Sequence, residues 1–137
     1  MGIEALVVED EDLMRMVIVR ILRKMCDEND EPIFSCVREA ADGADARKMC
    51  QEHPDIVFVT MDYTMPGENG NAVTRALMQT NPQLQVVGIT GSVGECNGAM
   101  LQAGAKDVLD KAVDLVSNLK RFIVQHVLSE VRRSSAQ

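Results

Sequence analysis

The sequence predicts an α/β fold in which a doubly wound sheet of five parallel strands is flanked by five helices. Short apolar runs alternate along the chain with longer segments whose apolar residues recur every three or four positions. This alternation is typical of repeated strand–helix units. Several of the apolar runs also end in acidic, hydroxyl or amine side chains, and open α/β sheets bind their ligands at the carboxyl ends of the strands.

The first half of the chain is expected to hold three strands and two helices. The first helix begins at about Asp12 and has an apolar residue at every fourth position along one face, which predicts an amphipathic helix. A polar stretch over residues 27–32 ends it. The apolar positions of that face are Leu13, Val17, Ile21 and Met25. The predicted strands are Ala5–Val8, Ile33–Val37 and Ile56–Met61, and the second helix is Ala44–His53.

The second half is expected to hold two strands and three helices. A turn over Pro66–Gly70 leads into the first of these helices, and Asn81-Pro82 ends it. Three glycines predict a flexible loop over Gly91–Gly98. The predicted strands are Leu84–Thr90 and Val108–Leu109, and the predicted helices are Ala72–Thr80, Ala99–Ala103 and Asp114–Arg132.

Composition limits the classes of function. The chain has 137 residues, of which 46% are apolar. This predicts one domain over residues 1–137, with a core at about 4–125 and a C-terminal helix extended to about 132. The net charge of −7 argues against nucleic acid as a partner. No apolar run approaches the roughly 18 residues of a membrane span, and no signal peptide is recognisable, so we expect a cytoplasmic protein that contacts no membrane.

Polar side chains at four predicted strand ends form the candidate site. Glu9 and Asp10 follow the first strand, Asp62 follows the third, and Thr90 and Lys111 lie at the ends of the fourth and fifth. Three carboxylates repel one another unless a cation joins them, and Mg²⁺ prefers oxygen ligands. A nucleophilic carboxylate beside a hydroxyl and an ammonium suits phosphoryl transfer. The sequence therefore predicts a magnesium-dependent site that forms an aspartyl phosphate.

From near its start to about Lys120, the chain resembles the receiver domains of two-component response regulators and hybrid histidine kinases. The resemblance rests on the pair Glu9-Asp10, the segment Met61–Gly70 and the segment Gly104–Lys111. It implies a flavodoxin-like sheet of strand order 2-1-3-4-5. It also implies a phosphorelay module rather than a dedicated enzyme. Such a module takes its phosphoryl group from a histidine kinase or a histidine phosphotransfer protein and signals to a downstream protein.

The resemblance also assigns a role to each site residue. Asp62 would be phosphorylated, and Lys111 would pair with the phosphoryl oxygens. Thr90 would move toward the phosphoryl group and carry the loop Thr90–Gly98 with it, so that this loop transmits the signal. The implied Mg²⁺ ligands are Asp10, Asp62 and the main-chain carbonyl of Thr64, with Glu9 acting through water.

Two positions depart from the pattern of that family. Receivers usually carry Tyr or Phe where this chain has Val108, so the ring that changes rotamer in the usual switch is missing. They also usually follow the lysine with proline, commonly through a cis bond, whereas Ala112 stands here. A cis bond before a residue other than proline costs ~2.5–4 kcal/mol, so a different placement of Lys111 is expected.

The sequence leaves several alternatives open. A degenerate receiver would bind partners without phosphorylation. A small phosphohydrolase of the haloacid-dehalogenase type also forms an aspartyl phosphate, but it needs a second Asp where this chain has Thr64. The chain could be a free-standing regulator or the receiver segment of a hybrid kinase. In the last helix, a second apolar stripe indicates either a homodimer contact or a more fully buried helix; its members are Val124, Leu128 and Val131.

Overall fold

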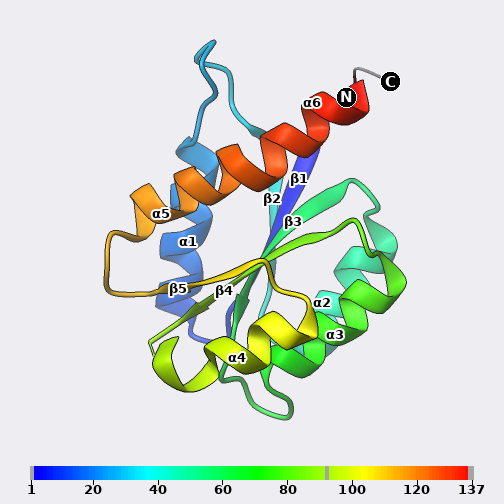
Figure 1. Ribbon diagram of the computed structural model, residues 1–137, viewed down its shortest axis with the longest axis vertical. Helices are drawn as coiled ribbons and strands as arrows, with labels where there is room; N and C mark the ends of the chain where they lie inside the picture. Colours follow the sequence, from blue (N-terminus) through cyan, green and yellow to red (C-terminus); the bar gives the residue numbers. More distant parts are fainter. Residues whose placement is uncertain (1, 92, 136–137) are drawn as a thin grey trace.

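The five predicted strands are present and form one parallel sheet. The structure, a computed structural model, describes residues 2–91 and 93–135. The strand order is β2-β1-β3-β4-β5, which confirms the expected doubly wound topology (Figure 1). The strands are β1 Ile3–Val8, β2 Phe34–Ala40, β3 Ile56–Asp62, β4 Gln85–Thr90 and β5 Asp107–Asp110.

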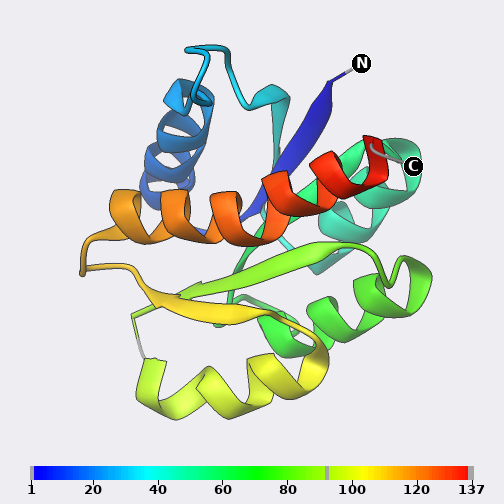
Figure 2. The same ribbon diagram turned by 45° about the horizontal axis from the view of Figure 1, so that its top comes forward.

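Helices cover both faces of this sheet. The first and last helices lie on one face and the three others on the opposite face, as Figure 2 shows. The helices are α1 Asp12–Lys24, α2 Gly43–Glu52, α3 Gly70–Thr80, α4 Val93–Ala103 and α5 Leu115–Phe122. α5 continues without a break through the π-helical turn η1 (Ile123–Leu128) into α6 (Ser129–Ser135). The described residues therefore form five helical bodies, as predicted.

The core forms two layers because successive strand residues point to opposite faces of the sheet. Val7 and Phe58 pack with α1 and α5, whereas Leu6 and Val59 pack with α2, α3 and α4. All four side chains are fully buried. Strands buried on both faces are expected to be apolar almost throughout, which explains the apolar runs of β1, β3 and β4, whereas the edge strand β2 also contains Arg38 and Glu39.

The predicted apolar face of α1 is only partly the buried one. Leu13 and Val17 are 67% and 43% exposed, whereas Ile18, Val19 and Leu22 are buried. Residues spaced strictly by four advance about 40° per step around a helix of 3.6 residues per turn. The predicted stripe therefore spirals away from the core, and only Met25 at its far end is buried.

The start of the fourth helix was also predicted wrongly. α4 begins at Val93, so the residues predicted as a flexible loop up to Gly98 are largely helical; Ser92 within that loop lies outside the described residues. Glycine costs a helix about 1 kcal/mol relative to alanine. Packing against the sheet through Cys96 and Met100, which are fully buried, overrides that local cost.

The long C-terminal helix is used mostly within its own domain. In its first stripe Leu119, Ile123 and Val127 are buried. In the second stripe Val124 is 44% exposed, but Leu128 packs against the core beside β1 and Val131 is half-buried. The stripe is thus partly buried within its own domain, and the homodimer contact stays a prediction.

No helix within residues 2–91 and 93–135 combines the length and apolar character needed to cross a bilayer.

Candidate functional site

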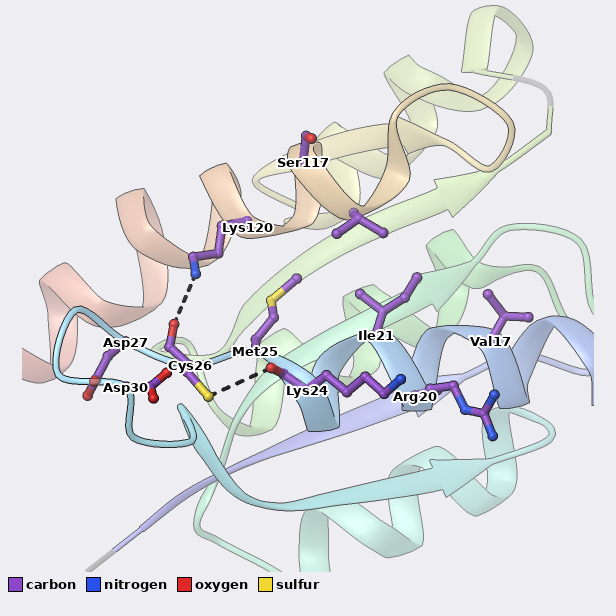
Figure 3. A pocket seen from close by; sticks show the side chains of 11 residues that line it. Val17, Arg20, Ile21, Lys24, Met25, Cys26, Asp27, Asp30, Ser117 and Lys120 are labelled. Atoms are coloured by element: carbon purple, nitrogen blue, oxygen red, sulfur yellow. Dashed lines mark hydrogen bonds between the residues drawn. The ribbon is translucent and has the colours of Figure 1, made fainter.

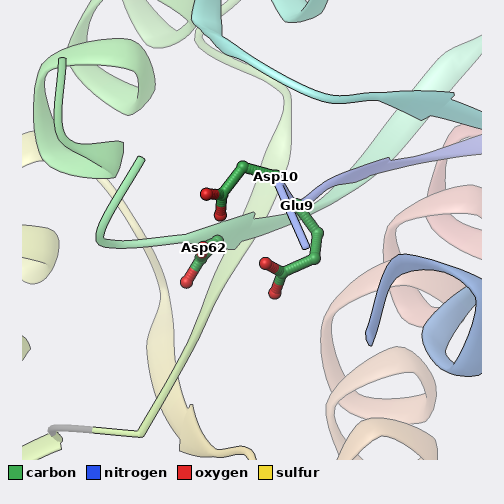
Figure 4. A group of neighbouring side chains, drawn as sticks. All are labelled: Glu9, Asp10 and Asp62. Atoms are coloured by element: carbon green, nitrogen blue, oxygen red, sulfur yellow. The ribbon is translucent and has the colours of Figure 1, made fainter. Parts of the chain in front are cut away.

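Three carboxylates meet at the carboxyl edge of the sheet. Val8 pairs with Met61 across β1 and β3, so the next residues along, Glu9 and Asp62, lie side by side where the strands end. Asp10 joins them from the segment that leads into α1. Oxygen atoms of the three side chains all lie within 4.8 Å of one another (Figure 4). Glu9 and Asp62 are buried, whereas Asp10 is exposed to solvent.

Lys111 brings one positive charge to this cluster. Its Nζ lies 2.9 Å from Glu9 Oε1 and 3.1 Å from Asp62 Oδ1. The lysine follows β5, and its main-chain N–H donates to the Thr90 carbonyl at 3.0 Å. The described residues contain no cis peptide bond, so the Lys111–Ala112 bond is trans, and the ammonium reaches both acids in this geometry.

The electrostatics of the site leave negative charge uncompensated. Burial raises the pKa of Asp62 to about 7, Glu9 adds to the rise, and the Lys111 ammonium opposes it. Burial by itself would lower the pKa of Lys111, but Glu9 and Asp62 outweigh it and raise that pKa. Three carboxylates thus share one ammonium. A set of oxygen donors with excess negative charge is what Mg²⁺ prefers, so these residues fit the expected ion.

The acids differ in the protein contacts that they already make. Glu9 Oε1 faces Lys111, and Glu9 Oε2 accepts from the N–H of Glu11 at 3.2 Å. Among the described residues no ion pair involves Asp10. Asp10 and Asp62 are therefore better placed than Glu9 to take a cation directly. Thr64, the residue whose carbonyl was predicted to help, lies two residues beyond Asp62 in the exposed segment before α3.

The two predicted switch positions, Thr90 and Val108, differ in their surroundings. Thr90 is the last residue of β4 and is buried. Val108 pairs with Gly88 across β4 and β5. A Cβ at Gly88 would meet Met100 Cε at 3.0 Å and both Val108 methyl groups at 3.4 Å. Val108 therefore packs beneath α4 against Met100. These small and flexible side chains lie at the position where receivers usually carry an aromatic ring.

The segment between Asp62 and α3 is held by contacts that sequence reasoning missed. The N–H of Gly70 donates to the Tyr63 carbonyl at 2.6 Å, and a Cβ at Gly70 would overlap the Asp62 carbonyl oxygen. Only glycine therefore fits there. Arg47 on α2 makes two hydrogen bonds to Glu68, at 2.6 and 2.7 Å, and so ties this segment to α2.

The fold and the site together define a class of protein. A doubly wound parallel sheet with an acidic triad and a lysine at its carboxyl edge is the arrangement expected of an aspartyl-phosphate signalling domain. The family model for the response regulator receiver domain matches residues 5–122. The chain therefore belongs to the response regulator receiver domain family.

Individual relatives agree with this assignment. The response regulator GacA of Pseudomonas viridiflava is 32% identical over 146 aligned positions, which cover 98% of this chain and 64% of GacA. The chemotaxis protein CheY of Bacillus subtilis is 36% identical, over 77% of this chain and 82% of CheY. Among solved structures, a chain of the CheX-CheY-BeF3-Mg+2 complex from Borrelia burgdorferi has a TM-score of 0.76 at 26% identity, covering 91% of this chain and 90% of that one.

Proposed function

We propose that this receiver domain accepts a phosphoryl group on Asp62 and thereby carries a signal in a two-component system or phosphorelay. The observation that carries the proposal is the position of Asp62, buried at a strand end, 3.1 Å from an ammonium and within a cluster of acids. A lone structural aspartate would not need two further carboxylates beside it.

Each residue of the site has its own role in the proposed phosphoryl transfer. An Asp62 carboxylate oxygen attacks the phosphorus of a phosphohistidine, the P–N bond breaks, and the imidazole leaves with a proton while an acyl phosphate forms on Asp62. Lys111 neutralises charge on the transferring oxygens, and the Thr90 hydroxyl donates a hydrogen bond to one of them. Asp10, Asp62 and the Thr64 carbonyl would hold a Mg²⁺ ion, with Glu9 acting through water, and the ion would supply further positive charge there. In this role the domain is a phosphoryl acceptor and not a dedicated enzyme.

Measurement of intact mass tests the proposal. The protein is incubated with Mg²⁺ and phosphoramidate, a small donor whose P–N bond mimics that of phosphohistidine. The expected product carries one added phosphoryl group, which is lost slowly by hydrolysis. An unchanged mass, with the fold intact by circular dichroism, would favour the degenerate receiver that binds partners without phosphorylation.

An apolar surface beside the site fits a protein phosphodonor. Leu13, Met16 and Val17 on α1 are 67%, 61% and 43% exposed, and Val113 and Val116 beyond Lys111 are 55% and 57% exposed. Val17 and Val116 both line a pocket of about 800 Å³. Figure 3 shows this pocket between α1, which carries Val17, and α5, which carries Ser117 and Lys120. Exposed apolar clusters mark interaction sites, and a phosphohistidine can reach Asp62 only if its protein docks next to the site.

Substitution of Leu13 should separate docking from chemistry. Leu13→Ser is expected to slow transfer from a phosphorylated histidine phosphotransfer protein at least about tenfold, the scale of losing one well-packed apolar contact at an interface. Its rate with phosphoramidate should not change. Leu101→Ser on α4 makes the same change at another exposed leucine, which is 43% exposed, and serves as the control. Equal slowing with both donors would place the effect in the chemistry and contradict the docking surface.

The conformational response is expected to involve α4 more than β5. Thr90 can move toward a phosphoryl oxygen because a hydrogen bond to a charged oxygen is strong without any help from an aromatic ring. Amide NMR shifts on phosphorylation should therefore concentrate at Thr90 and along α4 to Met100, and remain small at Val108. Thr90→Ala should lose these shifts while still taking the phosphoryl group, and Thr90→Ser should restore them. Large shifts confined to β5, with α4 silent, would contradict this model.

A further inference from the structure

Arg15 lies in the first turns of α1, close to Glu9 and Asp10 but outside the cluster of three carboxylates. Its guanidinium makes three contacts. Nη1 donates to the main-chain carbonyl of Glu9 at 2.9 Å, Nη2 to Asp12 Oδ1 at 2.6 Å, and Nε to Glu39 Oε1 at 3.2 Å. Its side chain is 17% exposed. One side chain thus joins α1 to the end of β1 and to β2.

The carbonyl that Arg15 holds belongs to the peptide between Glu9 and Asp10. Successive side chains of an extended strand point to opposite faces, yet both of these carboxylates reach the cluster around Asp62 (Figure 4). The chain must leave the strand conformation at this peptide, whose plane sets the direction of Asp10 relative to Glu9. β2 fixes the other side of Glu9, because the Glu9 N–H donates to the Ala40 carbonyl at 3.0 Å.

We propose that Arg15 is a positioning residue for the divalent cation site. It holds the Glu9–Asp10 peptide in the orientation that turns both acids toward Asp62, and it touches neither the cation nor the phosphoryl group. This inference rests on the proposed function, because it requires that the acids bind a cation. A planar guanidinium can make the three directional contacts at once, whereas the compact ammonium of lysine cannot.

The direction of the effect separates positioning from long-range electrostatics. Arg15 is a cation near a cation-binding site, and it neutralises Asp12 and Glu39. Removal of Arg15 makes the site more negative, which through Coulomb attraction alone would tighten Mg²⁺ binding. Loss of positioning has the opposite consequence, because the two acids would no longer be held in one cluster, and binding would weaken.

The test measures Mg²⁺ affinity by tyrosine fluorescence of the full chain. The sequence contains one tyrosine and no tryptophan, and that tyrosine, Tyr63, directly follows Asp62, so its emission reports the site. Arg15→Gln and Arg15→Lys are both expected to weaken Mg²⁺ binding about tenfold or more, the scale for residues that orient metal ligands. Arg23→Gln is the control, because Arg23 is an exposed arginine of the same helix with no ion pair among the described residues.

Three outcomes decide the proposal. The Arg15 variants should reach nearly the wild-type rate of phosphorylation by phosphoramidate at saturating Mg²⁺, which a general loss of structure would not allow. Unchanged or tighter Mg²⁺ binding in Arg15→Gln, while the unaltered chain binds Mg²⁺, would overturn the role of Arg15 alone. Absence of Mg²⁺ binding in the unaltered chain would overturn both this role and the proposed function. Thermal unfolding curves identify a temperature at which every variant is folded. If Arg15→Gln does not fold, Arg15→Lys provides the test, because it keeps the positive charge.

Discussion

Replacement of Asp62 by asparagine is expected to abolish phosphoryl uptake from phosphoramidate and from a phosphohistidine protein. An amide oxygen is a far weaker nucleophile than a carboxylate oxygen. Glu9 is also buried and contacts Lys111, but its second oxygen already accepts from the Glu11 N–H, so Asp62 is the carboxylate that we expect to react. The fold should persist, because asparagine has nearly the same volume and removes a buried charge that the site stabilises poorly. Incorporation of labelled phosphate over time measures the effect.

The chain offers a matched control at the opposite end of β3. Asp55 directly precedes β3 and is exposed at the opposite end of the sheet. Asp55→Asn makes the same chemical change away from the site and should leave uptake unaffected. Full labelling of the Asp62→Asn protein would mean that another residue accepts the phosphoryl group, and the assignment of the site would then be wrong.

Removal of Mg²⁺ should reduce phosphorylation almost as severely. Without the ion, Lys111 is the cation that faces Glu9 and Asp62, and an incoming phosphoryl group would add more negative charge. Loss of one preorganised charge contact in an active site typically costs about 10²–10³-fold in rate, so at least a hundredfold decrease is expected in excess chelator. Initial rates across a Mg²⁺ titration measure it, and undiminished phosphorylation in chelator would count against the site.

The two strand-end acids should differ in this titration. Glu9 already contacts Lys111 and the Glu11 N–H, whereas the exposed Asp10 has no ion pair in the described part of the chain. Asp10→Ala should therefore raise the half-saturating Mg²⁺ concentration more than Glu9→Ala does. The reverse order would show that Glu9 binds the ion directly and that Asp10 acts through water.

Much of the fold could be predicted from local sequence patterns, because the central strands are apolar runs and most of the helices have an amphipathic period. The errors arose where tertiary packing overrides local preference. The glycines before Gly98 suggested a loop, but burial of Cys96 and Met100 stabilises a helix there. In α1 the amphipathic helix was predicted correctly, but the residues that the core buries, Ile18, Val19 and Leu22, lie outside the apolar stripe found in the sequence.

The meeting of the candidate residues was also predictable, since Glu9, Asp10, Asp62, Thr90 and Lys111 all lie at strand ends that the parallel topology must bring together. The residues that hold them in place were not. Arg15 contacts Glu39, 24 positions away, and Arg47 contacts Glu68, 21 positions away. Such pairs leave no local pattern in a single sequence. Gly70 could have been suspected only from the turn in which it lies, because the close approach to the Asp62 carbonyl is a property of the folded chain.

Chemical trapping of the phosphorylated residue tests the central claim most directly. Borohydride reduces an acyl phosphate of aspartate to homoserine and leaves free carboxylates unchanged, so the modified position can be found by peptide mass spectrometry. After treatment with phosphoramidate and Mg²⁺, we expect homoserine at position 62 and at no other aspartate of the chain. Homoserine at Asp10 or elsewhere, with Asp62 intact, would contradict the account.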